Sequence, residues 1–239
     1  MLAPHGLRNS RTIARPRPDA SLVILVRMGK AAEGSKSYLE VEIKLLVRDL
    51  SAISAQLQTL GARRQQRVFE QNTIYDTPEA DFRRYGRLIR LRVETPARGP
   101  KRALMTAKAP PQASAPRTLS SRRVRRRPQY KERLEREVVV SNPARAERFL
   151  RAVGIRPVFR YEKYRTQFEL PGLHIALDET PAGVFVELEG SPRPIDRVAR
   201  ALGYTPRDYF RGTYWDVYAA LCRQKRHKPW NMLFPREKL

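Results

Sequence analysis

The sequence predicts an α+β domain of antiparallel strands with a few flanking helices, and three observations support this class. Eight short segments between residues 38 and 189 are predicted to be strands, and in nearly all of them apolar residues occupy every second position, a pattern typical of strands that bury one face. Four segments with helical periodicity lie between or after them. The chain has 239 residues, of which 41% are hydrophobic, so it can bury a sizeable core.

The first half of the predicted domain opens with the strand YLEVEIKLLV at 38–47. A helix is predicted over 49–62, because Asp49 suits its N-cap, Leu57 lies on its apolar face and Gly61 suits its end. Three further strands follow, RVFEQNTIYD at 67–76, RLIRLRVE at 87–94 and RALMTAK at 102–108.

The second half repeats the plan after a long basic loop. The strand RLEREVVV is followed by a helix with Asn142 as its cap, Pro143 in its first turn and Gly154 past its end. The remaining predicted elements are strands at 160–168, 173–179 and 184–189 and helices at 194–203 and 213–224.

The composition of the chain bears on where in the cell the protein is expected. No apolar run approaches the roughly 18–20 residues that a membrane helix needs, so we expect no membrane association. The single cysteine, Cys222, excludes an internal disulfide and suits a cytoplasmic protein. We expect the Cys222 side chain to be packed on the last helix. We also expect packing, rather than stacking on a nucleotide base, for the aromatic residues near that helix, Tyr209, Tyr214, Trp215 and Tyr218.

The net charge of +24 invites a nucleic-acid interpretation, but its distribution tempers it. Residues 1–35, 109–130 and 222–239 account for 15 of these charges. We expect 1–35 to be a disordered basic extension, with Met28 as an alternative start, followed by a single domain over 36–239. The loop at 109–130 is expected to be solvated; RNA or polyanion binding through its arginines is the weaker alternative.

In the predicted strands, charged residues occupy the positions that alternate with the apolar ones. A solvent-exposed charged face is the ordinary explanation for one strand. Here the charges are sorted between strands, and the opposite rows are apolar enough to pack against the helices. A closed sheet with helices outside would turn the charged rows inward and enclose a polar channel. Its interior would hold Lys44, Arg90, Arg92, Lys108, Arg133, Lys163 and Arg165, and Glu40, Glu42, Glu135, Glu137, Asp178, Glu187 and Glu189.

Seven cations and seven anions in one interior are costly unless they pair or meet a ligand. Arginine fits phosphate oxygens with two parallel hydrogen bonds. Clustered carboxylates provide the hard oxygen ligands that Mg²⁺ and Mn²⁺ prefer. The channel therefore predicts a polyanion bound together with a divalent metal.

Several motifs resemble one known family. EVEIK at 40–44 is similar to the ExExK signature of the CYTH superfamily, the triphosphate tunnel metalloenzymes. The same order of motifs continues to the C-terminus with LIRLR, the lysine of TAK, RLERE, KYR, LDETPAGVFVELEG and TYWDVY. The loop at 109–130 departs from this pattern and either closes over a tunnel mouth or extends into solvent.

The resemblance implies an eight-stranded antiparallel barrel around a tunnel for triphosphate with Mg²⁺ or Mn²⁺. It implies phosphate contacts by Lys44, Arg90, Arg92, Lys108, Arg133, Lys163 and Arg165. It implies metal binding first by Glu40, Glu42, Glu187 and Glu189, with Glu135, Glu137 and Asp178 as ligands or as supports of neighbouring bases. A homodimer is a further implication.

The resemblance also implies an enzyme, and two reactions remain open. The stretches FRYEKYRT and LDETPAGVFVELEG look most like class IV adenylyl cyclases, which convert ATP to cyclic AMP and pyrophosphate. Hydrolysis of tripolyphosphate or thiamine triphosphate is the alternative, and it requires nothing beyond the tunnel. The residues show no signal for a purine pocket and identify no general base.

Overall fold

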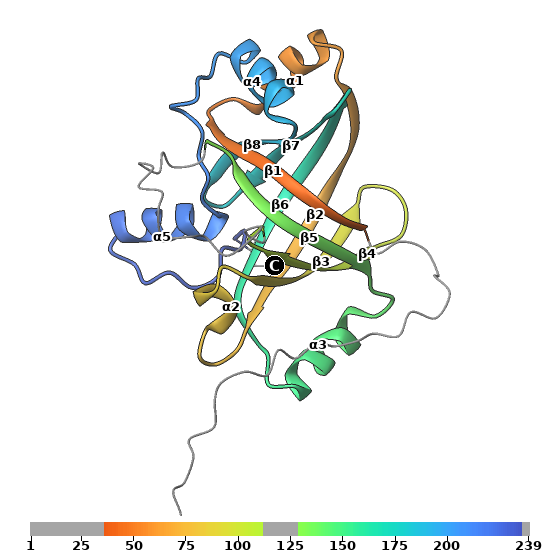
Figure 1. Cartoon of the computed structure of the whole chain (residues 1–239), viewed down its shortest axis with the longest axis vertical. Helices are drawn as coiled ribbons and strands as arrows, with labels where there is room; N and C mark the ends of the chain where they lie inside the picture. Colours follow the sequence, from red (N-terminus) through yellow and green to blue (C-terminus); the bar gives the residue numbers. More distant parts are fainter. Residues whose placement is uncertain (1–35, 112–128, 236–239) are drawn as a thin grey trace, which may run out of the picture. The chain divides into compact units, whose positions relative to one another are not determined.

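The computed structural model describes residues 36–111 and 129–235, in which eight antiparallel strands close into a barrel flanked by helices (Figure 1). The elements in chain order are β1 (Lys36–Val47), α1 (Leu50–Thr59), β2 (Arg63–Asp76), α2 (Asp81–Arg84), β3 (Leu88–Pro96), β4 (Arg102–Ala109), β5 (Lys131–Val139), α3 (Pro143–Ala152), β6 (Arg156–Leu170), β7 (Leu173–Thr180), β8 (Gly183–Gly190), α4 (Pro192–Ala201) and α5 (Tyr214–Gln224).

The strand order around the barrel is β1-β5-β4-β3-β2-β6-β7-β8, and β8 pairs with β1 to close it. Every neighbouring pair is antiparallel. This arrangement confirms the predicted α+β class and the eight-stranded barrel.

The register aligns the charged rows on the inside of the barrel. Glu42 of β1 lies opposite Lys131 of β5 on one side and Glu189 of β8 on the other. On β2, Glu70 lies opposite Lys163 of β6. Because a one-residue slip would turn every side chain to the other face, this register sets which charges share the interior.

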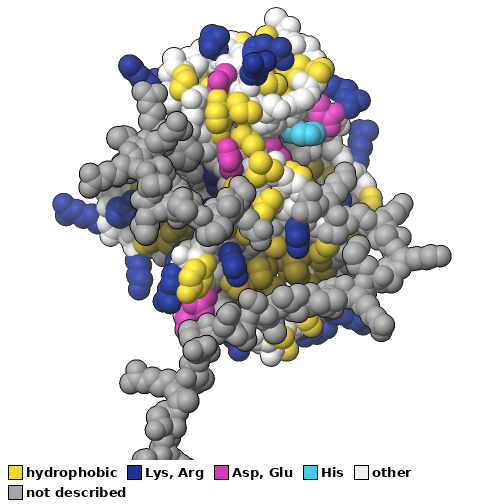
Figure 2. All heavy atoms as spheres, viewed as in Figure 1, with side chains coloured by type: hydrophobic (Ala, Val, Ile, Leu, Met, Phe, Trp, Pro, Cys, Tyr) yellow, Lys and Arg dark blue, Asp and Glu magenta, His cyan; other side chains and the backbone are white. Residues whose placement is uncertain are grey.

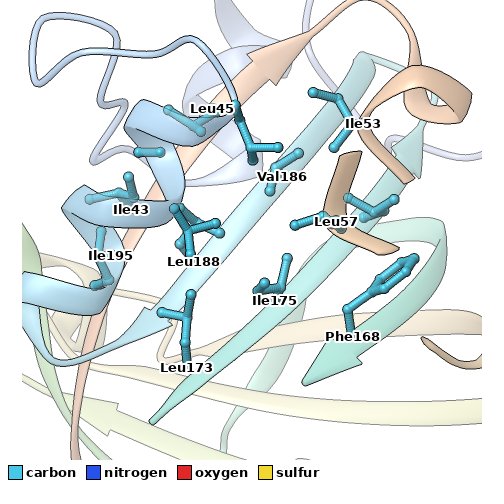
Figure 3. Packing of buried hydrophobic residues seen from close by; sticks show 14 of the residues in the cluster. Ile43, Leu45, Ile53, Leu57, Phe168, Leu173, Ile175, Val186, Leu188 and Ile195 are labelled. Atoms are coloured by element: carbon cyan, nitrogen blue, oxygen red, sulfur yellow. The ribbon is translucent and has the colours of Figure 1, made fainter. Parts of the chain in front are cut away.

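The main hydrophobic core lies outside the barrel wall, between the strands and two helices. Figure 3 shows Ile53 and Leu57 of α1 and Ile195 of α4 over the apolar row that includes Leu188 of β8 and Ile43 of β1. All five side chains are buried. Their burial is the driving force that holds the apolar rows outward, at about 25 cal/mol per Å² of apolar area.

The predicted helix ends are confirmed. Asp49 accepts hydrogen bonds from Ser51 N and Ala52 N at the start of α1, at 2.8 and 3.0 Å. After α1, Gly61 adopts a φ of +81°, the left-handed conformation that favours glycine. Asn142 caps α3 through Arg145 N at 3.0 Å.

Some details differ from the sequence prediction. β2 begins at Arg63 and β6 at Arg156, each four residues earlier than predicted, and β1 and β5 begin at Lys36 and Lys131, each two residues earlier. The four-residue helix α2 was not predicted, because a single turn has no periodicity to detect. The apolar row of β1 is not fully covered, since Leu39 is 51% exposed.

The predictions for residues 1–35 and for most of the basic loop at 109–130 lie outside the described residues. On the face shown in Figure 2, lysine and arginine side chains are dispersed rather than gathered into one patch. Within the described ranges, no helix is both long enough and apolar enough to cross a membrane.

Candidate active site

A cavity of about 1550 Å³ is lined by the inner rows of the barrel strands, together with residues at the barrel rim. Thirteen of the fourteen residues predicted to face the channel line it, namely Lys44, Arg90, Arg92, Lys108, Arg133, Lys163, Arg165, Glu40, Glu42, Glu135, Glu137, Glu187 and Glu189. The fourteenth, Asp178, is fully buried and contacts two of the cations. The structure therefore brings the whole predicted set together.

Four carboxylates from neighbouring strands form an acidic cluster, which we define as Glu40, Glu42, Glu135 and Glu189. Lysines hold three of them. Lys108 Nζ lies 2.6 Å from both Glu40 Oε1 and Glu135 Oε2. Glu42 Oε1 contacts Lys131 Nζ at 2.6 Å and Lys44 Nζ at 2.9 Å.

The carboxyl groups of this cluster differ in the direction of their pKa shifts. Burial, followed by the charge of Glu40, raises the pKa of Glu189 to about 7, and its carboxylate makes no ion pair with any residue that the structure describes. Burial also raises the pKa of Glu40, although Lys108 opposes the shift. For Glu42, burial would raise the pKa, but Lys44 and Lys131 outweigh it and the pKa is lowered. Within the described residues, Glu42 thus has two lysine partners, whereas Glu189 has no ion-pair partner.

A second group of charges surrounds Glu70 of β2. Its carboxylate lies 3.6 Å from both Arg92 Nη1 and Lys163 Nζ, and 3.7 Å from Arg165 Nε. Glu70 is 1% exposed. Burial would raise its pKa, but Lys163 and Arg92 outweigh that effect and hold it below the usual value. One buried anion therefore serves three predicted phosphate-binding cations.

Asp178 of β7 is the second anchor of these cations. Its carboxylate accepts hydrogen bonds from Lys163 Nζ at 2.9 Å, Arg165 Nε at 2.7 Å and the Tyr214 hydroxyl at 2.5 Å. Arg165 also bonds to Glu187, which lies 3.1 Å from Lys44 Nζ. In this structure Asp178 supports the basic groups.

Arg90 and Arg133 differ from the other cations, because neither forms an ion pair with a carboxylate among residues 36–111 and 129–235. Arg90 Nη2 donates to Thr106 Oγ1 at 3.2 Å, while its buried Nε has no partner. Arg133 Nη1 donates to the carbonyl oxygen of Gly86 at 2.6 Å. Both side chains line the cavity, so they have donors available for an anion.

Gly86 has a direct role in placing Arg133. Its φ is +65°, and a Cβ built there would lie 3.2 Å from Pro110 Cγ and 3.4 Å from Arg133 Nη1. A larger residue would crowd the guanidinium and strain the backbone.

Three site residues were not found from the sequence. Glu70 lies in a row that includes Val68 and Ile74, so β2 shows no separation of apolar and charged faces. Lys131 lies just before the predicted start of its strand, and extending the row by one step would have found it. Tyr214 was predicted to pack, and it does pack edge-on against the Phe185 ring at 5.3 Å; its bond to Asp178 was not foreseen.

The carboxylates suit a hard divalent cation in chemistry but do not yet converge on one. Within the described residues, no three acidic, histidine or cysteine side chains are arranged to hold a metal ion. The acidic cluster consists of carboxylate oxygens, and burial, followed by the charge of Glu40, raises the pKa of Glu189 within it. This donor set fits Mg²⁺ or Mn²⁺ once its lysines take another anion.

A closed antiparallel barrel lined by basic and acidic rows defines a barrel protein with a charged tunnel. The sequence model of the CYTH domain family matches residues 38–204. The chain belongs to the CYTH domain family. No curated protein matches it significantly.

Solved structures share the fold at low sequence identity. A protein from Pyrococcus horikoshii is 22% identical with a TM-score of 0.60, over 78% of this chain and 99% of that chain. A candidate adenylate cyclase from Vibrio parahaemolyticus is 18% identical with a TM-score of 0.58, over 75% and 97%. A candidate adenylyl cyclase from Hippeastrum, described as having a dominant triphosphatase activity, is 17% identical with a TM-score of 0.51, over 76% and 95%.

Proposed function

We propose that the chain is a metal-dependent enzyme that cleaves a phosphoanhydride bond of a triphosphate held in the barrel. One observation carries the proposal: the same cavity is lined by Arg90 and Arg133, which pair with no carboxylate in the described part of the chain, and by the largely buried acidic cluster. A metal-bound triphosphate satisfies both, because its oxygens accept from the arginines and its cation neutralises the carboxylates.

The chain's own residues would bind and orient the phosphates. Arg90 and Arg133 would donate first, and Lys44, Arg92, Lys108, Lys163 and Arg165 would exchange part of their carboxylate contacts for phosphate oxygens. Fixed positive charge around the transferred group stabilises the charge that develops in the transition state. Such contacts are stronger in the low-dielectric surroundings of a protein interior than in bulk water.

Glu40, Glu42, Glu187 and Glu189 would hold the metal, with Glu135 and Glu137 supporting neighbouring bases. When bound, Mg²⁺ or Mn²⁺ supplies Lewis-acid polarisation of phosphate oxygens and helps to align nucleophile and leaving group. The described residues identify no general base.

Cyclisation of ATP is the reaction we place first, on the motifs shared with class IV adenylyl cyclases. The ribose 3′-oxygen would bond to the α-phosphorus, the bond to the β-phosphate oxygen would break, and pyrophosphate would leave while the hydroxyl proton passes to solvent. Hydrolysis of tripolyphosphate or thiamine triphosphate is the second candidate, because the dominant activity described for the Hippeastrum protein is a triphosphatase activity. A cytoplasmic location is part of the proposal.

Product analysis tests the proposal and separates the two reactions. Purified protein is incubated with ATP, tripolyphosphate or thiamine triphosphate, each with Mg²⁺, with Mn²⁺ or with a chelator. We expect cyclic AMP and pyrophosphate in equal amounts from ATP, and only in the presence of metal. Phosphate release from tripolyphosphate without cyclic AMP would replace cyclisation by hydrolysis, and no turnover of any triphosphate would contradict the proposal.

A further inference from the structure

Helix α5 lies beyond the part of the chain that matches the CYTH domain family, yet it reaches into the tunnel. It begins with a capping box, in which Thr213 N donates to Asp216 Oδ2 at 2.6 Å and Asp216 N donates to Thr213 Oγ1 at 3.3 Å. The first helical residue, Tyr214, is buried and lines the cavity. The cap therefore fixes the backbone that carries this side chain.

The hydroxyl of Tyr214 meets the carboxylate that anchors two cations. It donates to Asp178 Oδ2 at 2.5 Å, and the same oxygen accepts from Lys163 Nζ at 2.9 Å and from Arg165 Nη2 at 2.5 Å. Three donors on one oxygen fix the rotation of the Asp178 carboxylate. The direction of the Lys163 ammonium then depends on the tyrosine hydroxyl.

The ring of Tyr214 contacts lysines from two separate strands. Lys163 Nζ of β6 lies 5.1 Å from the ring centre, and Lys44 Nζ of β1 lies 5.6 Å from it. Both distances are within the range of a cation–π contact. Phe185 packs edge-on against the ring at 5.3 Å and limits its movement. The ring thus joins β1 and β6, which are separated in the barrel by β7 and β8.

We propose that Tyr214 is a positioning residue for phosphate binding: its hydroxyl fixes Asp178, and its ring and that carboxylate together direct Lys163 and Lys44 into the cavity. This inference rests on the proposed function, because it takes the two lysines as phosphate ligands. It adds to the site a residue that lies beyond the matched range 38–204, and it makes α5 a functional part of the tunnel.

The competing explanation is that Tyr214 only fills space between Phe185 and Tyr161, whose rings lie 5.3 and 5.9 Å from it. The two explanations differ in whether the hydroxyl group of Tyr214 is needed. Packing depends on the ring alone, whereas positioning depends on the bond to Asp178. Tyr214→Phe retains the first and removes the second.

The test measures binding of tripolyphosphate by calorimetry in the presence of a chelator, so that no metal takes part. We expect Tyr214→Phe to weaken the Kd about tenfold or more, the value of one hydrogen bond to a charged group. With metal and substrate, KM should rise by a similar factor while kcat stays within about twofold, since the lost contact orients the ground-state phosphates. The melting temperature should fall by no more than the several degrees that the loss of one buried hydrogen bond produces.

The matched control is Tyr218→Phe on the same helix. The Tyr218 hydroxyl donates to the carbonyl oxygen of Asn231 at 2.9 Å, so its loss should leave the Kd unchanged. Equal Kd values for Tyr214→Phe and wild type would overturn the inference, as would an equal loss in both variants. A wild-type chain that binds no tripolyphosphate would contradict the proposed function itself, which distinguishes that failure from this one.

Discussion

Glu42→Gln is expected to lower metal-dependent turnover of triphosphate by about 100-fold or more, the typical effect of removing one preorganised electrostatic group. Glu42 lies at the centre of the acidic cluster, opposite Glu189 in the register and in contact with Lys44 and Lys131. Glutamine keeps the size and an acceptor oxygen for the lysines but removes the charge that would bind the metal. The barrel should therefore stay folded while metal binding fails.

The measurement is the initial rate with Mn²⁺, accompanied by circular dichroism and a melting curve. Glu132→Gln is the control, because Glu132 is exposed on the outer row of β5 and adjoins Lys131. Full activity of Glu42→Gln would show that β1 does not provide the metal ligands.

Glu70→Ala is expected to have the largest effect on stability. Its carboxylate is shared by Arg92, Lys163 and Arg165 in an enclosed interior. Removing one partner of a buried ion pair costs about 3–5 kcal/mol, because the remaining charge stays buried without compensation. For a domain of this size that corresponds to a decrease in the melting temperature of roughly 10 °C.

Tripolyphosphate should partly restore the stability of this variant, since it supplies the negative charge that the carboxylate gave. The ligand-induced rise in melting temperature is therefore expected to be larger in Glu70→Ala than in the wild type. Glu79→Ala removes an exposed glutamate as the control. A melting temperature equal to that of the wild type would show that Glu70 does not hold the cations together.

The inner and outer rows were predictable in every strand but β2, because the alternation of apolar and charged residues is visible within each of those segments alone. Glu40, Glu42 and Lys44 alternate with apolar neighbours, so their common face follows without knowledge of any partner strand. The prediction of a closed sheet followed from the helices, because their apolar faces had to pack against the apolar outer rows of the strands. In the structure, Leu57 and Ile195 meet those rows.

The pairing inside the barrel was not predictable, because it depends on register and on elements distant in the sequence. Lys108 reaches both Glu40 and Glu135 only because β4 and β5 align Lys108 with Glu135. The contact of Tyr214 with Asp178 depends on where α5 ends up relative to β7. Neither distance is encoded in a local pattern.

The pairings also explain how one interior can hold so many charges before a ligand binds. Glu70 and Asp178 keep the basic side chains from repelling one another, and Lys108 and Lys131 do the same for the acidic cluster. A metal-bound triphosphate would replace these ion pairs with its own contacts, rather than bind to charges that had been left unpaired. Selectivity for the ligand would follow from that exchange.

The most direct test of a tunnel site is a calorimetric titration with tripolyphosphate, with and without Mg²⁺, at two salt concentrations. We expect one site per chain, tighter binding with Mg²⁺, and a Kd weakened at least about tenfold by Arg90→Gln, because the Arg90 guanidinium has no carboxylate partner among the described residues and its donors are available for the anion. The net charge of +24 offers the rival outcome. Several weak sites that vanish with salt and ignore both Mg²⁺ and Arg90→Gln would mean that the anion binds the basic surface, and would contradict a triphosphate site inside the barrel.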